Sequence, residues 1–588
     1  MNRTSFAMIA AGTLVAAFLG PTAQATSGGE SPVTTKPATT VSPATTVSPA
    51  PPPGVDCDWG TATSGSTPPA ATPRAYLRGD DWRRDHEPPV ECAIGPAWTP
   101  LVQHFPYSKV IARSGFGGWG ISSALCTGLA DPRCGASDWT QLLTNSVMGH
   151  CDIATDFNCV ESLEVIDSQG NAQQATYLRG FPQTPAIPEF TAPGAFMPAG
   201  GSVPLWEYFT GTGTARILTT GLTTSTFNAT GGRWVQSPGD LFSFALVPVQ
   251  IEARPGVPKP GMVEQIDPST GLTGINRTGW GDPSTLGCAA FDTDECAIDA
   301  PFPADHRFRV TLRLRDTAAM YLNGAVDEPV AFSAKIDGGH RFVLEAAPSP
   351  VIGMAGWIPK SQVPRSVIDG ALASVGDTRY WDIDFDAASY RSLGRGGTGP
   401  LAWLKALLPF FGDRASFIVD AWYVENTTTL GQFTSGCMDR ARGEFIGIVS
   451  SNATAYTGDP PRYDPSTATL SYEVAGPHYM PDGITLSKGR YSINMNADFV
   501  QCLLGVAKVP SMARVELIYP DGEASAATLA VKQDKNWLRL YYENFTFSSP
   551  TVSVTFPKSL TCFKGKGKRV QTKKFVAFDC PKGWRPKR

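Results

Sequence analysis

Three pairs of cysteines in this chain repeat one spacing, in which the second cysteine lies eight positions after the first. The chain contains twelve cysteines, and this even number suits complete pairing into disulfides outside the reducing cytosol. Because short loops lose the least entropy when they close, the repeated spacing predicts three local bridges. The predicted local pairs are Cys126–Cys134, Cys151–Cys159 and Cys288–Cys296.

The other six cysteines are assigned less directly. Cys562 and Cys580 bracket a basic C-terminal segment and are expected to pair, which leaves Cys57–Cys92 and Cys437–Cys502 by elimination. Metal binding is the alternative use of cysteine, but the chain has no C-x-x-C motif and no histidine pair at ligand spacing. The cysteines therefore predict six disulfides and no zinc site.

The first 25 residues have the order of a secretory signal peptide. Arg3 is followed by an apolar run from Phe6 to Leu19 and then by the small-residue site Ala23-Gln24-Ala25. The alternative is a membrane anchor, but this run is shorter than the ~20 residues that span a bilayer. We expect cleavage after Ala25 and a mature chain that is secreted or held at the extracellular face of the cell envelope.

The composition favours a β-rich extracellular protein with many loops. Charged residues make up 17% of the chain, below the roughly 25% of an average soluble domain, while 59 glycines and 50 prolines are many. The apolar share of 42% still supports large cores. We expect a mainly β fold with several immunoglobulin-like or related β-sandwich domains in tandem and few short helices.

Local patterns support this fold class. In residues 308–315 (FRVTLRLR) the even-numbered side chains are apolar and the odd-numbered ones polar, which places the first set in a core and the second in water. Residues 551–556 (TVSVTF) alternate in the same way, and Pro520-Asp521-Gly522 predicts a turn between two strands. The best helix candidate lies near 400–408, with Pro409 expected to end it.

Changes in composition predict the domain organisation, with limits near 255 and 432. The expected segments are a signal peptide (1–25), a Pro/Thr/Ser-rich linker (26–54), a disulfide-containing β-rich domain (55–255), a β-rich domain with a short helix (256–432), a C-terminal β-sandwich domain (433–556) and a basic disulfide hairpin tail (557–588).

No motif identifies a catalytic centre. The stretch GFGGWG at 115–120 matches the dinucleotide fingerprint, but it lacks the βαβ context that this motif requires. The acids of CVESLEVID (159–167) and FDTDEC (291–296) could serve hydrolysis, yet none of the six histidines lies in a catalytic frame. The sequence favours a protein that is not an enzyme and has no cofactor.

Three aspartates form a candidate metal site. In YWDIDFDAASY, Asp382, Asp384 and Asp386 alternate with apolar residues, so a strand would present three carboxylates on one face. Such hard oxygen ligands suit a structural Ca²⁺ ion. The alternative is a solvated strand edge whose charges block aggregation.

The C-terminal tail is strongly basic although the chain is acidic. From Lys558 to Arg588, eleven Lys and Arg oppose only Asp579, which gives the tail a charge of +10, and residues 26–557 then carry −15. Such a tail is either a solubilising extension or a binding site for a polyanion. The predicted polyanion-binding residues are Lys564, Lys566, Lys568, Arg569, Lys573, Lys574 and Lys582.

The tail also carries a family resemblance. The segment CFKGKGKRVQTKKFVAFDCPKGWRPKR resembles the basic Cys-Lys-Gly-Lys…Cys-Pro tail of uncharacterised secreted proteins from high-GC Gram-positive (actinobacterial) bacteria. The preceding CMDRARGEFIGIVSSNATAYTG, GPHYMPDGITLSKGRYSINM and NFTFSSPTVSV resemble a module of large exported proteins from the same group. The resemblance covers about the last 150 residues and implies no activity or catalytic residue.

These observations lead to three hypotheses. The favoured one is a non-enzymatic envelope protein, structural or binding, whose tail docks on an anionic cell-wall polymer or membrane surface, with no nucleic-acid partner expected. The second is a secreted hydrolase of glycans or peptides that the same tail anchors. The third is a carbohydrate-binding adhesin.

Overall fold

The structure of the chain is a computed structural model. It describes residues 92–98, 108–114, 122–154, 156–237, 241–257, 261–266, 273–278, 288, 290–315, 320–355, 358–359, 389–393, 398–426, 435–441, 445–519, 524–534, 536–547, 549–565 and 570–586. The predicted signal peptide and linker, the glycine-rich stretch 115–120 and the predicted turn at 520–522 lie outside these residues.

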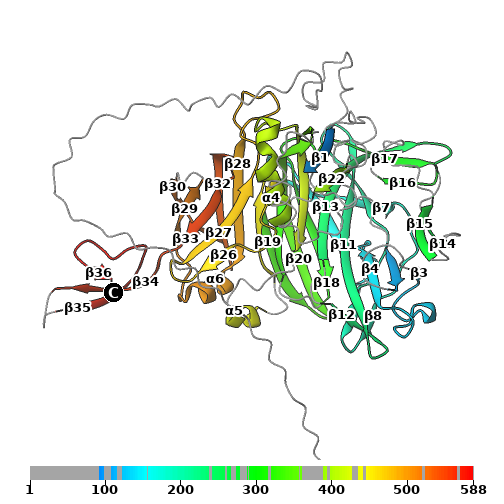
Figure 1. The fold of residues 1–588 in the computed structure, drawn as a ribbon, viewed down its shortest axis with the longest axis horizontal. Helices are drawn as coiled ribbons and strands as arrows, with labels where there is room; N and C mark the ends of the chain where they lie inside the picture. The colour runs from blue at the N-terminus through cyan, green and yellow to red at the C-terminus, as the bar shows by residue number, and fades with distance from the viewer. Residues whose placement is uncertain are drawn as a thin grey trace, which may run out of the picture. The chain divides into compact units, whose positions relative to one another are not determined.

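The fold is mainly β, as the sequence predicts, and one sheet contains strands from all three predicted domains (Figure 1). Neighbouring strands follow the order β3–β2–β4–β11–β13–β23–β19–β24–β28–β32–β31, and all pairs are antiparallel except β19 with β24. The bounds are β3 (Ser123–Cys126), β2 (Lys109–Arg113), β4 (Gln141–Val147), β11 (Thr214–Thr230), β13 (Leu241–Ala253), β23 (Phe417–Asn426), β19 (Met320–Ile336), β24 (Phe445–Ser451), β28 (Lys488–Asn496), β32 (Trp537–Thr546) and β31 (Lys532–Asp534).

Shorter strands extend this first sheet beside β11 and β13. β10 pairs with β7 and β11, β12 pairs with β11, and the hairpin of β16 and β17 pairs with β13. Their bounds are β7 (Thr176–Gly180), β10 (Pro204–Phe209), β12 (Arg233–Gln236), β16 (Ala290–Asp292) and β17 (Glu295–Asp299). Strand pairs of this sheet connect residues on either side of positions 255 and 432. The domain limits at these positions stay predictions.

A second sheet packs against the middle of the first one. Its order is β6–β5–β18–β20–β19, with β6 (Ala172–Gln174), β5 (Cys159–Ile166), β18 (Arg307–Leu314) and β20 (Gly339–Ala355). A shared core fills the space between the two sheets, and it contains Trp206, Phe244, Phe308, Val310, Leu312 and Trp422, none more than 2% exposed. Burial of this apolar surface, at ~25 cal/mol per Å², stabilises the pairing of the two sheets.

Two long strands belong to both sheets. The first half of β19 pairs with β23 and β24, and its second half, from Val326 on, pairs with β20 with an irregularity between Asp327 and Val330. β-bulges of this kind bend a strand, which lets β19 pass from one sheet to the other. β20 also belongs to both sheets, because it pairs with β18 and β19 in the second sheet and its residues 349–353 pair with β23 of the first sheet.

The alternation predicted for residues 308–315 is present in β18, but the outer face is not simply solvated. The apolar side chains face the core. The arginines of the other face lie between β5 and β20, where Arg313 bonds to Glu161 at 3.0 Å and Arg309 bonds to Glu345 at 2.8 Å and to Glu164. Arg313 is only 14% exposed. The predicted alternation therefore holds, but the outward arginines are ion-paired as well as partly exposed, because the neighbouring strands supply carboxylates at the same level.

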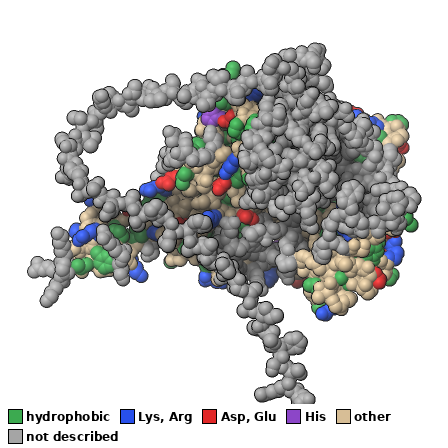
Figure 2. Space-filling model, viewed as in Figure 1, with side chains coloured by type: hydrophobic (Ala, Val, Ile, Leu, Met, Phe, Trp, Pro, Cys, Tyr) green, Lys and Arg blue, Asp and Glu red, His purple; other side chains and the backbone are tan. Residues whose placement is uncertain are grey.

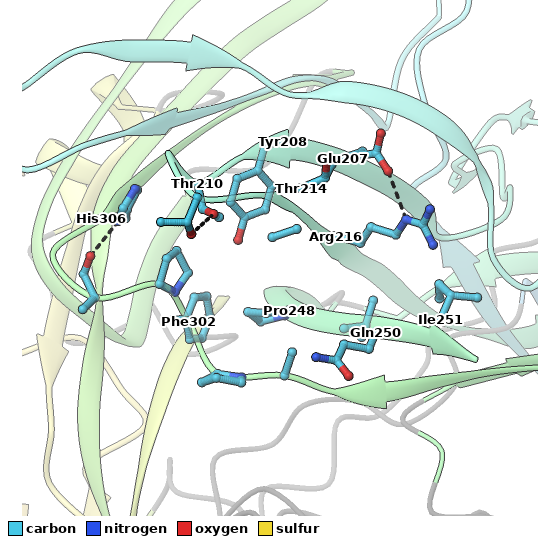
Figure 3. A pocket seen from close by; sticks show the side chains of 17 residues that line it. Glu207, Tyr208, Thr210, Thr214, Arg216, Pro248, Gln250, Ile251, Phe302 and His306 are labelled. Atoms are coloured by element: carbon cyan, nitrogen blue, oxygen red, sulfur yellow. Dashed lines mark hydrogen bonds and ion pairs between the residues drawn. The ribbon is translucent and has the colours of Figure 1, made fainter.

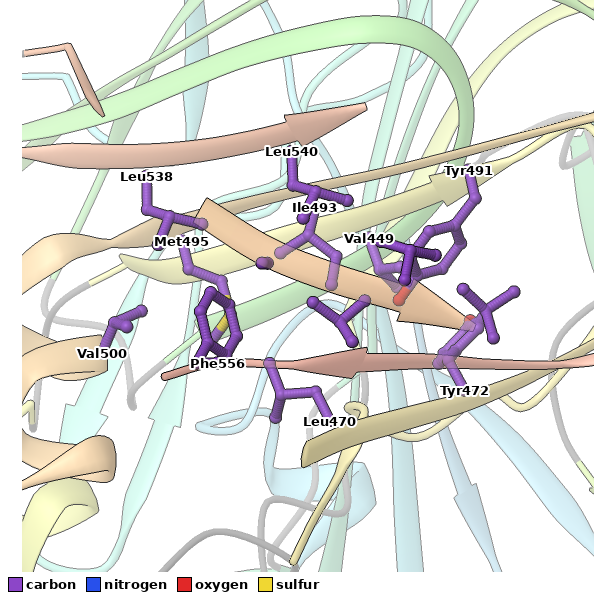
Figure 4. Packing of buried hydrophobic residues seen from close by; sticks show 14 of the residues in the cluster. Val449, Leu470, Tyr472, Tyr491, Ile493, Met495, Val500, Leu538, Leu540 and Phe556 are labelled. Atoms are coloured by element: carbon purple, nitrogen blue, oxygen red, sulfur yellow. The ribbon is translucent and has the colours of Figure 1, made fainter. Parts of the chain in front are cut away.

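A third sheet packs on the C-terminal end of the first sheet. It contains β25 (Ala455–Tyr456), β26 (Arg462–Asp464), β27 (Thr469–Ala475), β33 (Thr551–Thr555), β29 (Met512–Ile518) and β30 (Ala524–Ala530). Figure 4 shows the core between the layers, where Leu470 and Tyr472 of β27 face Ile493 and Met495 of β28. The inward side chains predicted for 551–556, at Val552, Val554 and Phe556, lie in this core.

The remaining strands are short or peripheral. β1 (Cys92–Trp98) pairs antiparallel with β20 and β21 (Ile358–Pro359) and parallel with β22 (Ser389–Leu393). Two separate hairpins are formed by β8 (Phe190–Ala192) with β9 (Ala195–Met197) and by β14 (Gly261–Ile266) with β15 (Thr273–Thr278). All described residues belong to one compact unit of the chain, Ala50–Arg588.

The helices of the described residues are few and short. The helix predicted near 400–408 is α4 (Thr398–Leu407), which buries Leu401 and Leu404 and continues as a 3₁₀ turn, η5 (Leu408–Phe411), at Pro409. The others are η2 (Pro132–Cys134), α5 (Ser435–Arg440) and α6 (Ala497–Leu504). Among the residues that the structure describes, no helix combines the length and apolar character needed to cross a membrane.

Five of the six predicted disulfides are present in the structure. They are Cys126–Cys134, Cys151–Cys159, Cys288–Cys296, Cys437–Cys502 and Cys562–Cys580. The sixth, Cys57–Cys92, stays a prediction because Cys57 lies outside the described residues. Cys437–Cys502 connects α5 to α6, whereas the three local bridges close loops beside strands.

Two glycines lie opposite phenylalanines in neighbouring strands. Gly489 of β28 pairs with Phe545 of β32, and Gly353 of β20 pairs with Phe417 of β23. In both pairs the aromatic ring covers the glycine so closely that a Cβ atom there would collide with it. These pairs therefore require glycine for packing.

We expect Glu161→Gln to lower the free energy of unfolding at pH 7 by about 1–3 kcal/mol, because it removes the carboxylate that binds Arg313 and Arg341. Burial alone would raise the pKa of Glu161, but these guanidinium groups outweigh it and lower the pKa. The stabilisation is therefore present above the ordinary glutamate pKa of about 4.3 and is lost as the pH falls through the lower folded value. Chemical denaturation at pH 7 and at acidic pH measures this difference.

Glu252→Gln is the matched control. Glu252 is 49% exposed and lies 3.5 Å from Arg254, so its loss should change stability by less than about 1 kcal/mol. Equal effects of the two variants at pH 7 would contradict a stabilising role of the charge ladder, the ion pairs that Glu161, Glu164 and Glu345 form with the arginines of β18 and β20.

We expect Gly489→Ala to destabilise the protein by about 1–3 kcal/mol, because the ring of Phe545 would have to move. Gly128→Ala is the control, since its Cβ would meet no atom within 4 Å. Thermal unfolding measures both variants, and equal midpoints would show that Phe545 does not need this glycine.

Candidate functional site

The basic tail forms a small sheet that a disulfide closes. β34 (Lys558–Lys564) pairs antiparallel with β35 (Gln571–Ala577) on one side and with β36 (Arg585–Pro586) on the other (Figure 1). Cys562 lies in the central strand and bonds to Cys580, which follows β35. Within residues 558–586, Cys562 is the one described side chain that is buried, so the disulfide takes the place of an apolar core.

The strand register puts cations on both faces of this sheet. Residues directly opposite each other in an antiparallel pair share a face. Lys573 lies opposite Cys562 and Lys564 opposite Gln571 on one face, while Lys574 lies opposite Thr561 on the other. A flat partner on either side would therefore meet positive charge.

Four of the seven predicted polyanion-binding residues are described, and all four are exposed. In the part of the tail that the structure describes, no carboxylate forms an ion pair with any of them, which are Lys564, Lys573, Lys574 and Lys582. Lys566, Lys568 and Arg569 lie outside the described residues. Figure 2 shows Lys and Arg side chains beside apolar ones on the tail.

Aromatic contacts order part of the tail. The ring of Phe575 lies 5.1 Å from that of Trp584 in an edge-on arrangement, and the ammonium group of Lys573 lies 5.3 Å from the Phe575 ring. Arg514 of β29 contacts the ring of Phe578, which connects the tail to the third sheet. These contacts hold the backbone that carries the lysines.

The acids that the sequence offers for hydrolysis are all bound to other groups. Glu161 and Glu164 bind arginines in the charge ladder. In the β16–β17 turn, buried Asp292 accepts the N–H groups of Gln183 and Thr293. In the same turn, Asp294 accepts the N–H of Gly256, and Glu295 bonds to Arg179.

The predicted calcium ligands lie outside the described residues, so Asp382, Asp384 and Asp386 stay a prediction. Within the described residues, no group of three or more His, Cys, Asp or Glu side chains is arranged to hold a metal ion.

The structure also contains a pocket that the sequence analysis missed. It has a volume of about 670 Å³ and lies between the β10–β11 hairpin, β13 and residues 300–306 (Figure 3). Its lining comes from three distant stretches of sequence, and none of them carries a motif. Only the pairing of the strands brings these stretches together.

Comparison with models of known protein families and with curated proteins gives no match to this chain.

We expect the double variant Cys562→Ser/Cys580→Ser to be cleaved by trypsin in the tail at least about ten-fold faster than the wild type. A disulfide of this kind contributes ~2–4 kcal/mol to stability by restricting the conformations of the unfolded chain. Timed digestion with mass spectrometry locates the cleavage at Lys573 and Lys574. Cys126→Ser/Cys134→Ser is the control, because its bridge lies far along the chain, and equal tail cleavage in both variants would show that the tail does not need its disulfide.

Proposed function

We propose that this protein is a secreted, non-enzymatic component of the cell envelope and that its basic tail docks on an anionic cell-wall polymer. In this proposal the first 25 residues are removed on export and residues 26–54 act as a spacer. The β-rich body consists of immunoglobulin-like or related sandwich domains in tandem and presents a binding or structural surface.

The exposed lysines of the tail carry this proposal. An ordered sheet holds them in place, and within the described residues no carboxylate neutralises Lys564, Lys573, Lys574 or Lys582. A polyanion that binds here does not have to displace a carboxylate of the described residues from these lysines. Because the sheet is closed by Cys562–Cys580, little conformational entropy is lost on binding.

The five disulfides support export. Disulfides persist in oxidising compartments and are rare in the reducing cytosol. The hydrolase alternative has less support, because the acids that could act in it are hydrogen-bonded or ion-paired in the β5 ladder and the β16–β17 turn.

We expect the quadruple variant in which Lys564, Lys573, Lys574 and Lys582 become glutamine to bind isolated cell walls at least about ten-fold more weakly. Each cation near an anionic surface contributes about 1 kcal/mol. Binding of the wild type should fall as ionic strength rises from about 0.1 M to about 1 M, because the Debye length shrinks from ~10 Å to ~3 Å. Sedimentation of the protein with wall fragments measures both effects.

A matched variant controls for the loss of four charges. It replaces exposed lysines of the body by glutamine, at Lys335, Lys488, Lys508 and Lys532. This variant should keep wall binding. Equal losses in the two variants, or wild-type binding that salt does not change, would overturn docking through the tail.

A further inference from the structure

The pocket in Figure 3 lies at the end of the β-ladder between β11 and β13. β11 and β13 are paired from Thr224 with Leu241 to Arg216 with Val249, where the ladder ends. Beyond this last pair, Thr214 and Ala215 line one wall, and Gln250 and Ile251 line the opposite wall. Residues 300–306 close the third side.

Backbone polar groups face the gap. The N–H of Ala300 donates to the carbonyl oxygen of Pro248 at 2.9 Å, so Pro248 directs its backbone groups toward the β17 side. In an antiparallel strand the direction alternates with each residue, and Ile251 therefore directs its N–H and C=O toward the space that β11 has left. A ligand in the pocket can reach one donor and one acceptor there.

The pocket has a rigid apolar floor. The ring of Phe308 lies 6.1 Å from that of Tyr208 and 5.5 Å from that of Phe302, edge-on in both cases. Tyr208 and Phe302 line the pocket, and both are almost fully buried in the core between the first and second sheets. The floor is therefore preformed and does not have to be ordered by a ligand.

The two charged side chains that line the pocket, Glu207 and Arg216, have opposite signs, so their charges sum to zero. The guanidinium of Arg216 lies 3.2 Å from the carboxylate of Glu207 on the neighbouring strand, with 41% and 33% of their side chains exposed. No other Lys, Arg, Asp or Glu lines this pocket in the described residues. His306, which also lines the pocket, donates from Nδ1 to the carbonyl oxygen of Ala304 at 2.6 Å, because a carbonyl oxygen can only accept.

The other polar groups suit a ligand with many hydroxyls. Gln250 offers an amide N–H₂ and a carbonyl oxygen, and threonine hydroxyls both donate and accept. The Glu207–Arg216 pair likewise presents an acceptor and donors side by side. Pro301, Pro303 and Ala304 add an apolar rim against which C–H groups can pack.

We propose that this pocket binds a neutral saccharide. A strongly anionic or cationic ligand would find no net charge to offset its desolvation, and a purely apolar ligand would leave Gln250, Glu207 and Arg216 without water. A short saccharide matches alternate donors and acceptors and presents C–H faces as well. The volume of about 670 Å³ lies within the ~300–1,000 Å³ of small-molecule sites.

This proposal does not depend on the basic tail. The tail recognises charge, and the pocket lies in the body of the protein and recognises hydroxyl groups. The two can therefore fail separately. If the tail docks on the wall, the pocket adds selectivity for a sugar of that surface.

Saturation-transfer NMR and calorimetry with the full-length protein test the proposal. The probes are galactose, arabinose, mannose and N-acetylglucosamine, with glucuronate as the anionic comparison, at about 1 M ionic strength so that charge effects of the tail are screened. We expect at least one neutral sugar to bind and to exceed glucuronate. Absence of binding by all four neutral sugars, or preference for glucuronate, would overturn the proposal.

Pocket variants separate this site from others. Gln250→Ala should weaken binding of that sugar about five-fold or more, as expected for one lost hydrogen bond, and Arg216→Met should do the same. Gln173→Ala on the exposed strand β6 is the control and should bind like the wild type. Circular dichroism confirms that each variant is folded, and unchanged affinity in both folded pocket variants would place the sugar elsewhere and overturn the proposal.

Discussion

Backbone hydrogen bonding along β19 and β20 is the interaction on which the other layers depend. Each of these strands pairs with partners in the second sheet through one part and with β23 through another. β19 also provides the parallel edge on which β24 and then β28 and β32 assemble. The irregularity between Asp327 and Val330 lies where β19 passes from its pairs in the first sheet to its pairs in the second.

Sequence patterns predicted the features that depend on residues close together in the chain. The period of two in residues 308–314 placed four side chains in the core, and the spacing of eight between cysteines predicted three disulfides. The partners of the outward arginines could not be predicted, because Glu164 and Glu345 reach Arg309 from strands far away in sequence. The same reason hid the pocket, since its existence depends on where the pairing of β11 and β13 stops.

In the candidate site too, the sequence predicted the local features and missed those that depend on distant residues. The paired cysteines and the density of lysine predicted a closed basic hairpin, and the structure contains that hairpin with β36 as a third strand. The sequence could not tell which charges have internal partners. Arginines of the body are bound to carboxylates within a sheet, whereas no carboxylate of the described residues forms an ion pair with Lys564, Lys573, Lys574 or Lys582. The arginines of the body thus hold neighbouring strands together, whereas the described lysines of the tail face outward.

The connection between tail and body has a mechanical consequence. Only Phe556 and Pro557 separate the end of β33 from the start of β34, and Phe556 is anchored in the core of the third sheet. β33 is hydrogen-bonded on both sides, to β27 and to β29. A tension applied to the tail would be transmitted along a central strand and shared between two ladders of backbone hydrogen bonds, so many bonds would have to break together.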